Sequence, residues 1–174
     1  MGAFLTVPTE EYAERLIEFR DEILDTGAKI EGSSNLLRYK DINDWLEHIK
    51  LHSSIDTVPA GEVPASQYIY VREEDGKIVG VTQLRHYLDR SLAMYFGHIG
   101  YGIRPSERRK GYATAMLHDL LDVCRQRGMD RVMISCLADN EASRRTILNN
   151  GGVLEETVWM PSREVYIEKY WITL

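Results

Sequence analysis

The amino-acid sequence predicts an α/β (α+β) fold in which a mixed central sheet carries helices on both faces. Two features of the chain support this. Apolar residues recur at three- and four-residue spacing up to about residue 50, which indicates helices, and follow strand patterns from Tyr68 onward. Residues 103–137 then have the pattern of strand, basic loop, helix and strand. The last of these, residues 132–137, is nearly all apolar, which is typical of a central parallel strand buried on both faces.

The N-terminal part of the chain predicts a short strand and two helices. The strand covers residues 3–7. Thr9 can cap the first helix, and Gly27 ends it. The apolar positions of this helix recur at helical spacing and are Tyr12, Leu16, Phe19, Ile23 and Leu24. A second helix begins near Asp41 and carries one apolar stripe.

Two polar loops flank the second helix, residues 28–37 and 53–64, and both are candidates for lining a substrate site. Within the helix, His48 and His52 have the i, i+4 spacing of a metal-binding pair. A zinc site normally needs three or four protein ligands, and the sequence offers no third. We therefore expect an exposed helix face and no metal.

The middle of the chain predicts strands. Asp75-Gly76 indicates a β-hairpin between residues 68–72 and 78–84, and a further strand covers residues 94–103. Glycine weakens a strand and often marks a bulge or a close approach of the backbone to a ligand. The alternative is a poorly packed edge strand. The glycines concerned are Gly97, Gly100 and Gly102.

The helix after the basic loop ends at Gly128, and its expected buried stripe is Ala113, Leu117, Leu120, Leu121 and Cys124. A right-handed crossover through this helix makes the strands on either side of it parallel. A short helix, residues 141–149, and two strands, residues 153–159 and 165–172, complete the chain. The aromatic residues of the last strand either pack in the core or line an acceptor pocket: Tyr166, Tyr170 and Trp171.

Length and composition indicate one globular domain over residues 1–174. Of the 174 residues, 44% are hydrophobic and 28% are charged, so the chain can bury a core without disulfides. We expect a cytoplasmic protein that does not enter the membrane, because no apolar run approaches the roughly 18 residues of a membrane span. The net charge of −6 disfavours nucleic acid as a partner. Cys124 and Cys136 lie in no metal-binding motif, and we expect buried, unreactive thiols.

The stretch RPSERRKGYA, residues 104–113, carries the strongest chemical signal. Four basic residues and one acidic residue lie within the seven positions 104–110 of a chain that is acidic overall. A helix N-terminus offers unpaired N–H groups and a partial positive charge, so a phosphate held there gains hydrogen bonds and dipole stabilisation. Gly111 lets the backbone approach the anion closely. The alternative is that the charges only solvate a loop.

Residues 108–113 resemble the R/Q-x-x-G-x-G/A signature of the GNAT acetyltransferase family, located as in that family between a strand and a long helix. Asn140, Ser143 and the helix end at 149–151 resemble the family's second conserved region. The resemblance covers nearly the whole chain and is strongest over residues 98–152. It implies a GNAT fold, whose mixed sheet is splayed, with acetyl-CoA as co-substrate and no metal.

The resemblance also implies which residues bind coenzyme A. The pyrophosphate would lie on the signature loop and helix start, which comprise Arg108, Arg109, Lys110, Gly111, Tyr112, Ala113 and Thr114. The pantetheine arm would pair like an added strand with backbone groups of Tyr101, Gly102 and Ile103. Asn140 and Ser143 would contact the arm or the adenosine side.

The expected reaction is acetyl transfer to a primary amine of a small molecule or peptide by direct attack. Neither cysteine is located as the nucleophile that a covalent intermediate would need. A base must neutralise the amine, and His98 has a pKa in the useful range. Side chains alternate along a strand, and the family commonly places its base at positions matching Gly97 or Ile99, so His98 serves only if the glycine bulge changes the phase. Ile147 stands where the family often has a tyrosine acid.

Two other functions fit parts of the sequence. A non-catalytic acyl-CoA-binding sensor or regulatory module would keep the basic loop but needs no base. A domain that binds another nucleotide would also use the loop, although the G-x-x-x-x-G-K-[ST] signature is missing. The identity of the acceptor and the oligomeric state, a homodimer included, are left open.

Overall fold

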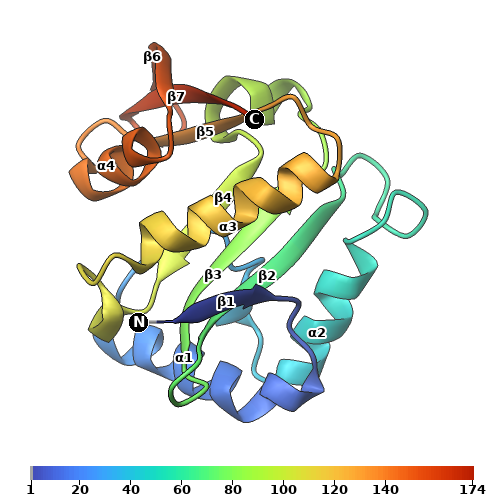
Figure 1. Ribbon diagram of the computed structural model, residues 1–174. Coiled ribbons are helices and arrows are strands. Elements are labelled where there is room, and N and C mark those ends of the chain that lie inside the picture. Colours follow the sequence, from blue (N-terminus) through green and yellow to red (C-terminus); the bar gives the residue numbers. More distant parts are fainter. Residues whose placement is uncertain (1) are drawn as a thin grey trace.

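A seven-stranded sheet forms the centre of the computed structural model, which describes residues 2–174. Its strands lie in the order β1-β2-β3-β4-β5-β7-β6 (Figure 1). Their bounds are β1 Ala3–Thr6, β2 Ala65–Arg72, β3 Ile78–Arg85, β4 Ile99–Ile103, β5 Arg131–Leu137, β6 Val153–Met160 and β7 Val165–Thr173. The helices are α1 Ala13–Thr26, α2 Ile42–Leu51, α3 Tyr112–Gln126 and α4 Glu141–Asn149, with short turns of helix at Glu10–Tyr12, Leu36–Arg38, Leu92–Phe96 and Pro105–Glu107.

The sheet is mixed because β4 and β5 run parallel while the other neighbouring strands are antiparallel. The parallel pair is the one that α3 connects, as the sequence predicts. Its ladder consists of Ile99 opposite Ile134, supplemented by an isolated bridge from Gly97 to the same residue. β2 and β3, in contrast, pair along most of their length. Toward their C-terminal ends β4 and β5 therefore separate, and the sheet is splayed.

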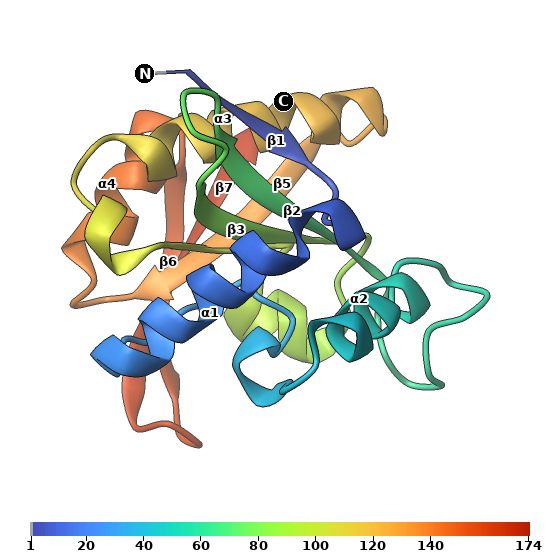
Figure 2. The same ribbon diagram turned by 90° about the horizontal axis from the view of Figure 1, so that it is seen from below.

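Helices cover both faces of the sheet (Figure 2). α1 and α2 lie on one face, where their apolar side chains pack on Ile69, Val71, Ile78 and Val81 of β2 and β3. α3 and α4 lie on the other face, over a core that includes Leu84, Ile99, Val132, Ile134 and Ile172. β2 and β3 contribute to both cores through alternate side chains, so the two helical layers fix one sheet. No helix within residues 2–174 is long and apolar enough to cross a membrane.

Local signals set the helix boundaries in most places. The carboxylate of Asp41 accepts a hydrogen bond from the backbone N–H of Asn43 at 2.8 Å and so caps α2 as expected. Gly27 ends α1 with a left-handed φ of 62°. Two expectations for α1 are wrong. Thr9 makes no side-chain cap and precedes a 3₁₀ turn, and Leu24 is 52% exposed because it lies beside the buried stripe and not within it.

The strand expected over residues 94–103 begins late. Leu92–Phe96 forms a π-helical turn, Gly97 turns the chain with φ 72°, and β4 starts at Ile99. The carboxylate of Asp89 accepts a hydrogen bond from the N–H of Leu92 at 2.8 Å, which favours a helical start. This local bond and the turn at Gly97 outweigh the β-propensity of the aromatic residues that follow.

Candidate functional site

The loop before α3 presents a row of backbone N–H groups. The loop passes through left-handed conformations at Arg109 and Gly111, with φ of 62° and 87°. Among the hydrogen bonds within residues 2–174, none uses as donor the N–H of Arg109, Lys110, Gly111, Ala113 or Thr114. The last two belong to the first turn of α3, whose N–H groups have no partner inside the helix. The loop therefore offers donors and the positive end of a helix dipole to an anion.

Gly111 is at the centre of this loop for a backbone reason. Its φ of 87° is a conformation that other residues seldom adopt, and a Cβ built there meets no atom within 4 Å. The protein itself therefore does not fill the space above Gly111. A pyrophosphate fits both observations, because it needs close approach and several N–H donors.

The basic residues of the loop divide into two groups. Arg104 points inward, where its Nε lies 2.5 Å from the Glu22 carboxylate and its guanidinium also reaches the Ile78 carbonyl. Lys110 pairs at 2.9 Å with the buried carboxylate of Glu107. Both side chains therefore hold the fold together, a use that the sequence did not indicate.

The buried carboxylate of Glu107 forms ion pairs with three basic side chains. It contacts Arg72 at 3.0 Å, Lys77 at 2.8 Å and Lys110 at 2.9 Å. Burial alone would raise the pKa of this carboxyl, but the hydrogen bonds from Lys77 and Lys110 lower the pKa of Glu107 to about 2. The ion pairs tie residues 104–111, the candidate phosphate loop (called the phosphate loop below), to the β2–β3 hairpin.

Arg108 and Arg109 are the two exposed basic residues that remain. Arg108 donates from Nε to the Ile103 carbonyl at 3.1 Å and from Nη2 to the Lys29 carbonyl at 3.4 Å, which fixes the end of β4. Arg109 makes no hydrogen bond or ion pair within the described part of the chain, so its guanidinium is free to meet an anion.

The backbone N–H and C=O groups on one side of β4 pair with β3, and those on the other side point toward the gap between β4 and β5. The N–H of Arg104 donates to Val79 at 2.9 Å, and the carbonyl of His98 accepts from Arg85 at 2.7 Å. Even-numbered residues of β4 thus bond to β3, and by alternation Tyr101 and Ile103 face the side of β5. Gly102 stands opposite Val81 and pairs with β3, which differs from the expectation that its backbone meets the pantetheine arm.

The β4 glycines make room for the protein's own loop. A Cβ on Gly100 would lie 3.2 Å from the Cα of Gly32, and one on Gly102 would lie 2.2 Å from a side-chain carbon of Ile30. Residues 30–32 therefore rest directly on β4. The close approach inferred from these glycines exists, but the approaching group is a loop of the chain and not a ligand.

Asn140, Ser143 and Tyr101 form a small polar group across the splay. The Asn140 side chain caps α4 by accepting from the N–H of Ser143 at 3.1 Å. The Ser143 hydroxyl lies 2.8 Å from the hydroxyl of Tyr101, whose ring reaches from β4 to α4. Burial raises the pKa of Tyr101 to about 12, so the phenol keeps its proton.

His98 is held between β4 and β5. Its backbone N–H donates to the Met133 carbonyl at 2.7 Å, and its Nδ1 accepts from the Met133 N–H at 2.9 Å. Burial first, and the nearby Arg85 charge second, lower the pKa of the His98 imidazole to about 4. The ring is therefore neutral at pH 7, with its proton on Nε2 and its lone pair directed at a backbone amide.

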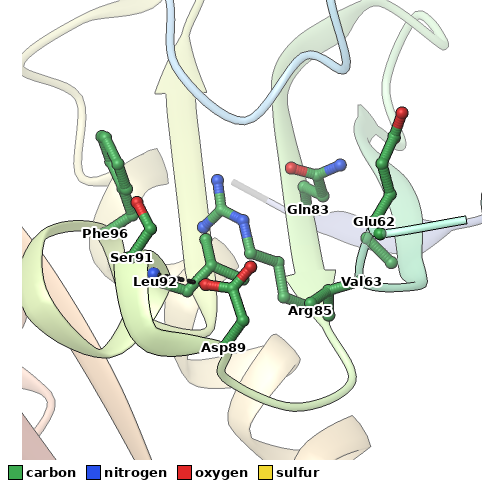
Figure 3. Close-up of a pocket in the computed structure, with 10 residues that line it drawn as sticks. Glu62, Val63, Gln83, Arg85, Asp89, Ser91, Leu92 and Phe96 are labelled. Carbon is green, nitrogen blue, oxygen red and sulfur yellow. Dashed lines mark hydrogen bonds between the residues drawn. The ribbon is translucent and has the colours of Figure 1, made fainter.

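Two adjoining clefts open beside the start of β4. Figure 3 shows residues that line the first of them. They have volumes of about 260 and 290 Å³ and share Glu62, Val63, Ala65, Gln83 and Arg85. The first continues to the π-helical turn, where Leu92 and Phe96 supply apolar walls. The second continues to the loop after α1 and to α2. Both polar loops that flank α2 thus line a cleft, whereas the phosphate loop lines neither.

Arg85 lies at the junction of the two clefts. Figure 3 shows its side chain extending from the end of β3 between Gln83 and the π-helical turn. One nitrogen, Nη1, donates to the Gly97 carbonyl at 3.1 Å, and the guanidinium makes no ion pair within residues 2–174. Burial lowers the pKa of Arg85, and the charges of Glu31 and Asp89 offset part of that effect. Arginine nevertheless stays charged at neutral pH.

The histidine pair on α2 lines the second cleft, which corrects the expectation of an exposed face. The rings of His48 and His52 lie 4.0 Å apart between centroids, and Nε2 of His52 is 3.1 Å from the Glu62 carboxylate. Burial and the neighbouring His52 lower the pKa of His48. No group of three His, Cys, Asp or Glu side chains in the described chain is arranged to hold a metal.

The C-terminal aromatic residues line neither cleft. Tyr170 is buried and donates to Glu168 at 2.7 Å, and Trp171 stacks with Arg131 at 4.2 Å. Tyr166 is exposed against Trp159. Ile147, at the position of the missing acid, is fully buried in the core. Both cysteines are buried, and burial raises the pKa of each thiol to about 11, as expected for inert thiols.

Sequence reasoning did not find Arg85, Gln83 or Glu62. Gln83 and Arg85 lie at alternate positions near the end of a strand, and Glu62 lies in a loop, so no spacing links the three residues. The one signal was polar character at positions 83 and 85 of a strand whose other residues are mostly buried. That pattern equally describes an exposed strand end.

The model of the acetyltransferase (GNAT) family matches residues 36–151. No curated protein sequence matches the chain significantly.

Solved structures of acetyltransferases share the fold. The microcin C7 self-immunity acetyltransferase MccE, in complex with acetyl-CoA and AMP, is 22% identical with a TM-score of 0.70, over 99% of this chain and 92% of that one. The ribosomal-protein-S5-alanine acetyltransferase of Vibrio fischeri is 15% identical with a TM-score of 0.71, over 99% and 93%. The ribosomal L7/L12 α-N-protein acetyltransferase RimL, in complex with coenzyme A, is 18% identical with a TM-score of 0.71, over 99% and 94%.

Proposed function

Because the chain belongs to the GNAT acetyltransferase family, we propose that it transfers the acetyl group of acetyl-CoA to a primary amine by direct attack. The carrying observation is that the N–H groups of Arg109, Lys110, Gly111, Ala113 and Thr114 donate to no acceptor within residues 2–174. Residues 109–111 are exposed to solvent, so these N–H groups are accessible to a ligand, and a pyrophosphate supplies the acceptors. The two cores share one sheet, so we assign the activity to one domain.

The proposed binding mode follows the loop and the strand. The N–H groups of residues 109–114 hold the pyrophosphate, with Arg108 and Arg109 beside it. The backbone groups of Tyr101 and the N–H of Ile103 bond the pantetheine arm where β4 leaves β5, while the Ile103 carbonyl accepts from Arg108. Asn140 and Ser143 orient the start of α4 next to this arm, and Tyr101 joins them. We give Gly102 no bond to the arm, because it pairs with β3.

In the proposed reaction the neutral amine attacks the thioester carbonyl, and the carbon–sulfur bond then breaks to give the amide and the thiolate of CoA. The amine loses a proton, and the thiolate or solvent takes one up. We do not assign His98 as the base, because its lone pair is bonded to the Met133 amide. We propose that it positions β4 against β5 at the splay.

Release of free CoA in the presence of a panel of amines tests the function. We expect acetyl-CoA to stabilise the protein, by about 2.7 kcal/mol at 100 times its dissociation constant, and at least one amine to cause turnover. Binding without turnover on any amine would support a non-catalytic sensor. No binding at millimolar acetyl-CoA would overturn the assignment of the phosphate loop.

A further inference from the structure

Arg85 makes no ion pair with a carboxylate within residues 2–174, although the charges of Glu31 and Asp89 act on it from nearby. Its guanidinium has five N–H donors, and the one bond to the Gly97 carbonyl uses one of them. No buried side-chain nitrogen or oxygen within residues 2–174 lacks a hydrogen-bond partner. The Arg85 nitrogens without a protein partner are therefore not sealed in the core. They face the junction of the two clefts, which both count Arg85 among their walls.

A guanidinium in this position favours a carboxylate. Its planar, forked donors match the two oxygens of a carboxylate, and the partial burial of Arg85 strengthens the pairing. An acceptor that is only a cation, such as a polyamine, would instead bring a like charge to Arg85. The apolar walls of the first cleft, Val63, Leu92 and Phe96, leave room beside the guanidinium for an uncharged side chain.

The cleft also carries groups that accept hydrogen bonds from an amine. The carboxylate of Glu31 makes no hydrogen bond or ion pair within residues 2–174, and it lines the second cleft with Glu62. Gln83 donates through Nε2 to the Ser34 hydroxyl at 2.9 Å, which leaves its carbonyl oxygen available. The combination of one guanidinium with several acceptors suits a ligand that has both charges.

The position of Arg85 relates this ligand to the reaction. Its Nη1 is bonded to Gly97, and its Nη2 lies 3.8 Å from a Cβ built on Gly100, so the guanidinium lies beside the start of β4. In the proposed function the pantetheine arm runs from the phosphate loop past Ile103 and Tyr101, so its thioester end lies toward this start of β4. From these contacts we infer that the acceptor is a small amine that carries a carboxylate, and that Arg85 binds this carboxylate. This inference rests on the proposed function.

The test uses matched pairs of acceptors. Phenylalanine, leucine, methionine and β-alanine are each compared with the corresponding amide and the corresponding amine without the carboxyl group. We expect kcat/KM to be at least about 10-fold higher for the carboxylated member, because a charged hydrogen-bonded pair is lost in the others. Equal use of the members of every pair, or preference for the amides, would overturn the inference while the proposed function stands.

Variants locate the selectivity on Arg85. Arg85→Gln should lose the preference for carboxylated amines, mostly through KM, and keep the wild-type affinity for acetyl-CoA. Arg85→Lys should keep part of the preference, because it keeps the charge but not the fork. The control is Arg90→Gln, since Arg90 is exposed and lines neither cleft. An equal loss by Arg85→Gln on all acceptors would show a structural role and overturn the inference.

Equilibrium binding of the same pairs to the CoA-loaded protein is a readout that needs no turnover. Binding that selects the carboxylated member and depends on Arg85, without any acetylation, would overturn the proposed function and support the ligand class. Acetylation of amines without any selectivity for the carboxylated member would support the proposed function and overturn the inference about the ligand class.

Discussion

The Nδ1 atom of His98 accepts a hydrogen bond from the backbone N–H of Met133 at 2.9 Å, and so joins the two strands at the point where they begin to separate. This bond occupies the lone pair that a general base would need. Two substitutions distinguish the roles. His98→Asn retains an acceptor at a similar distance from the backbone, whereas His98→Leu leaves the Met133 N–H without a partner.

We expect His98→Asn to retain most of kcat and stability, and His98→Leu to lose about 1–3 kcal/mol of unfolding free energy, the cost of an unsatisfied buried amide. Because the folded-state pKa of about 4 lies below the ordinary value of 6.5, His98 stabilises the fold above pH 6.5 and this contribution falls as the pH drops toward 4. Steady-state kinetics and urea unfolding from pH 7 to 5 measure both. A loss of 10² or more in kcat for both variants would make His98 the base after all.

Gly111→Val should cost acetyl-CoA affinity far more than stability, because its side chain enters the space above the phosphate loop. The control is Gly128→Val, at the other end of α3. Gly128 also has a left-handed φ, 74° against 87°, and a Cβ there likewise meets no atom within 4 Å. Both variants should therefore lose a similar 1–3 kcal/mol of stability through backbone strain. Titration calorimetry with acetyl-CoA should separate them, and equal affinities would remove the pyrophosphate from this loop.

Ile147→Tyr should destabilise the protein by roughly 1–3 kcal/mol through overpacking. The side chain of Ile147 is fully buried, and a Cβ on Gly152 would already lie 2.4 Å from it. Its neighbour Leu148 is 48% exposed, so Leu148→Tyr is the control and should be neutral. Thermal unfolding measures the difference. From the sequence alone a tyrosine at position 147 would be neutral or stimulating, and a stable, faster Ile147→Tyr enzyme would show that the helix face can move.

Glu107→Gln should cost on the order of 3 kcal/mol at pH 7, because three cations lose their buried partner. The pKa of Glu107 is lowered to about 2 from an ordinary 4.5, so the stabilisation is complete above pH 4.5 and is lost as the pH falls toward 2. The difference between wild type and variant should thus narrow below pH 4.5. Glu74→Gln, in the exposed part of the same hairpin, should have no such effect. A difference that does not change between pH 7 and 3.5 would show that packing and not charge is responsible.

Sequence patterns predicted the sheet, the parallel pair and the crossover helix because each depends on local periodicity. The apolar run at 132–137 is typical of a central strand, and β5 is central in the sheet. The π-helical turn at Leu92–Phe96 was not predicted, since the same aromatic residues suit a strand, and the bond to Asp89 and the turn at Gly97 that oppose a strand are not visible in the apolar pattern.

The sequence predicted only the part of the candidate site that one continuous segment of the chain forms. The phosphate loop is continuous in sequence, whereas the clefts combine β3, the loops beside α2 and the π-helical turn. Nothing in the sequence spacing of Arg85 and Glu62 indicates that both residues line the same clefts. The partners of Arg104 and Lys110 were likewise hidden, because Glu22 and Glu107 meet them through tertiary contacts.

Residues 30–32 pack directly on the glycines of β4, and this contact limits how the protein can be re-engineered. A library that varies the acceptor range would naturally diversify the two cleft loops, but they are not equally free. The Cβ of a substituted Gly61 meets no atom within 4 Å, whereas that of a substituted Gly32 would lie 2.2 Å from the Gly100 carbonyl. Grafts at the loop around Gly61 are therefore independent of β4, while grafts at 30–32 must be selected together with compensating changes in β4.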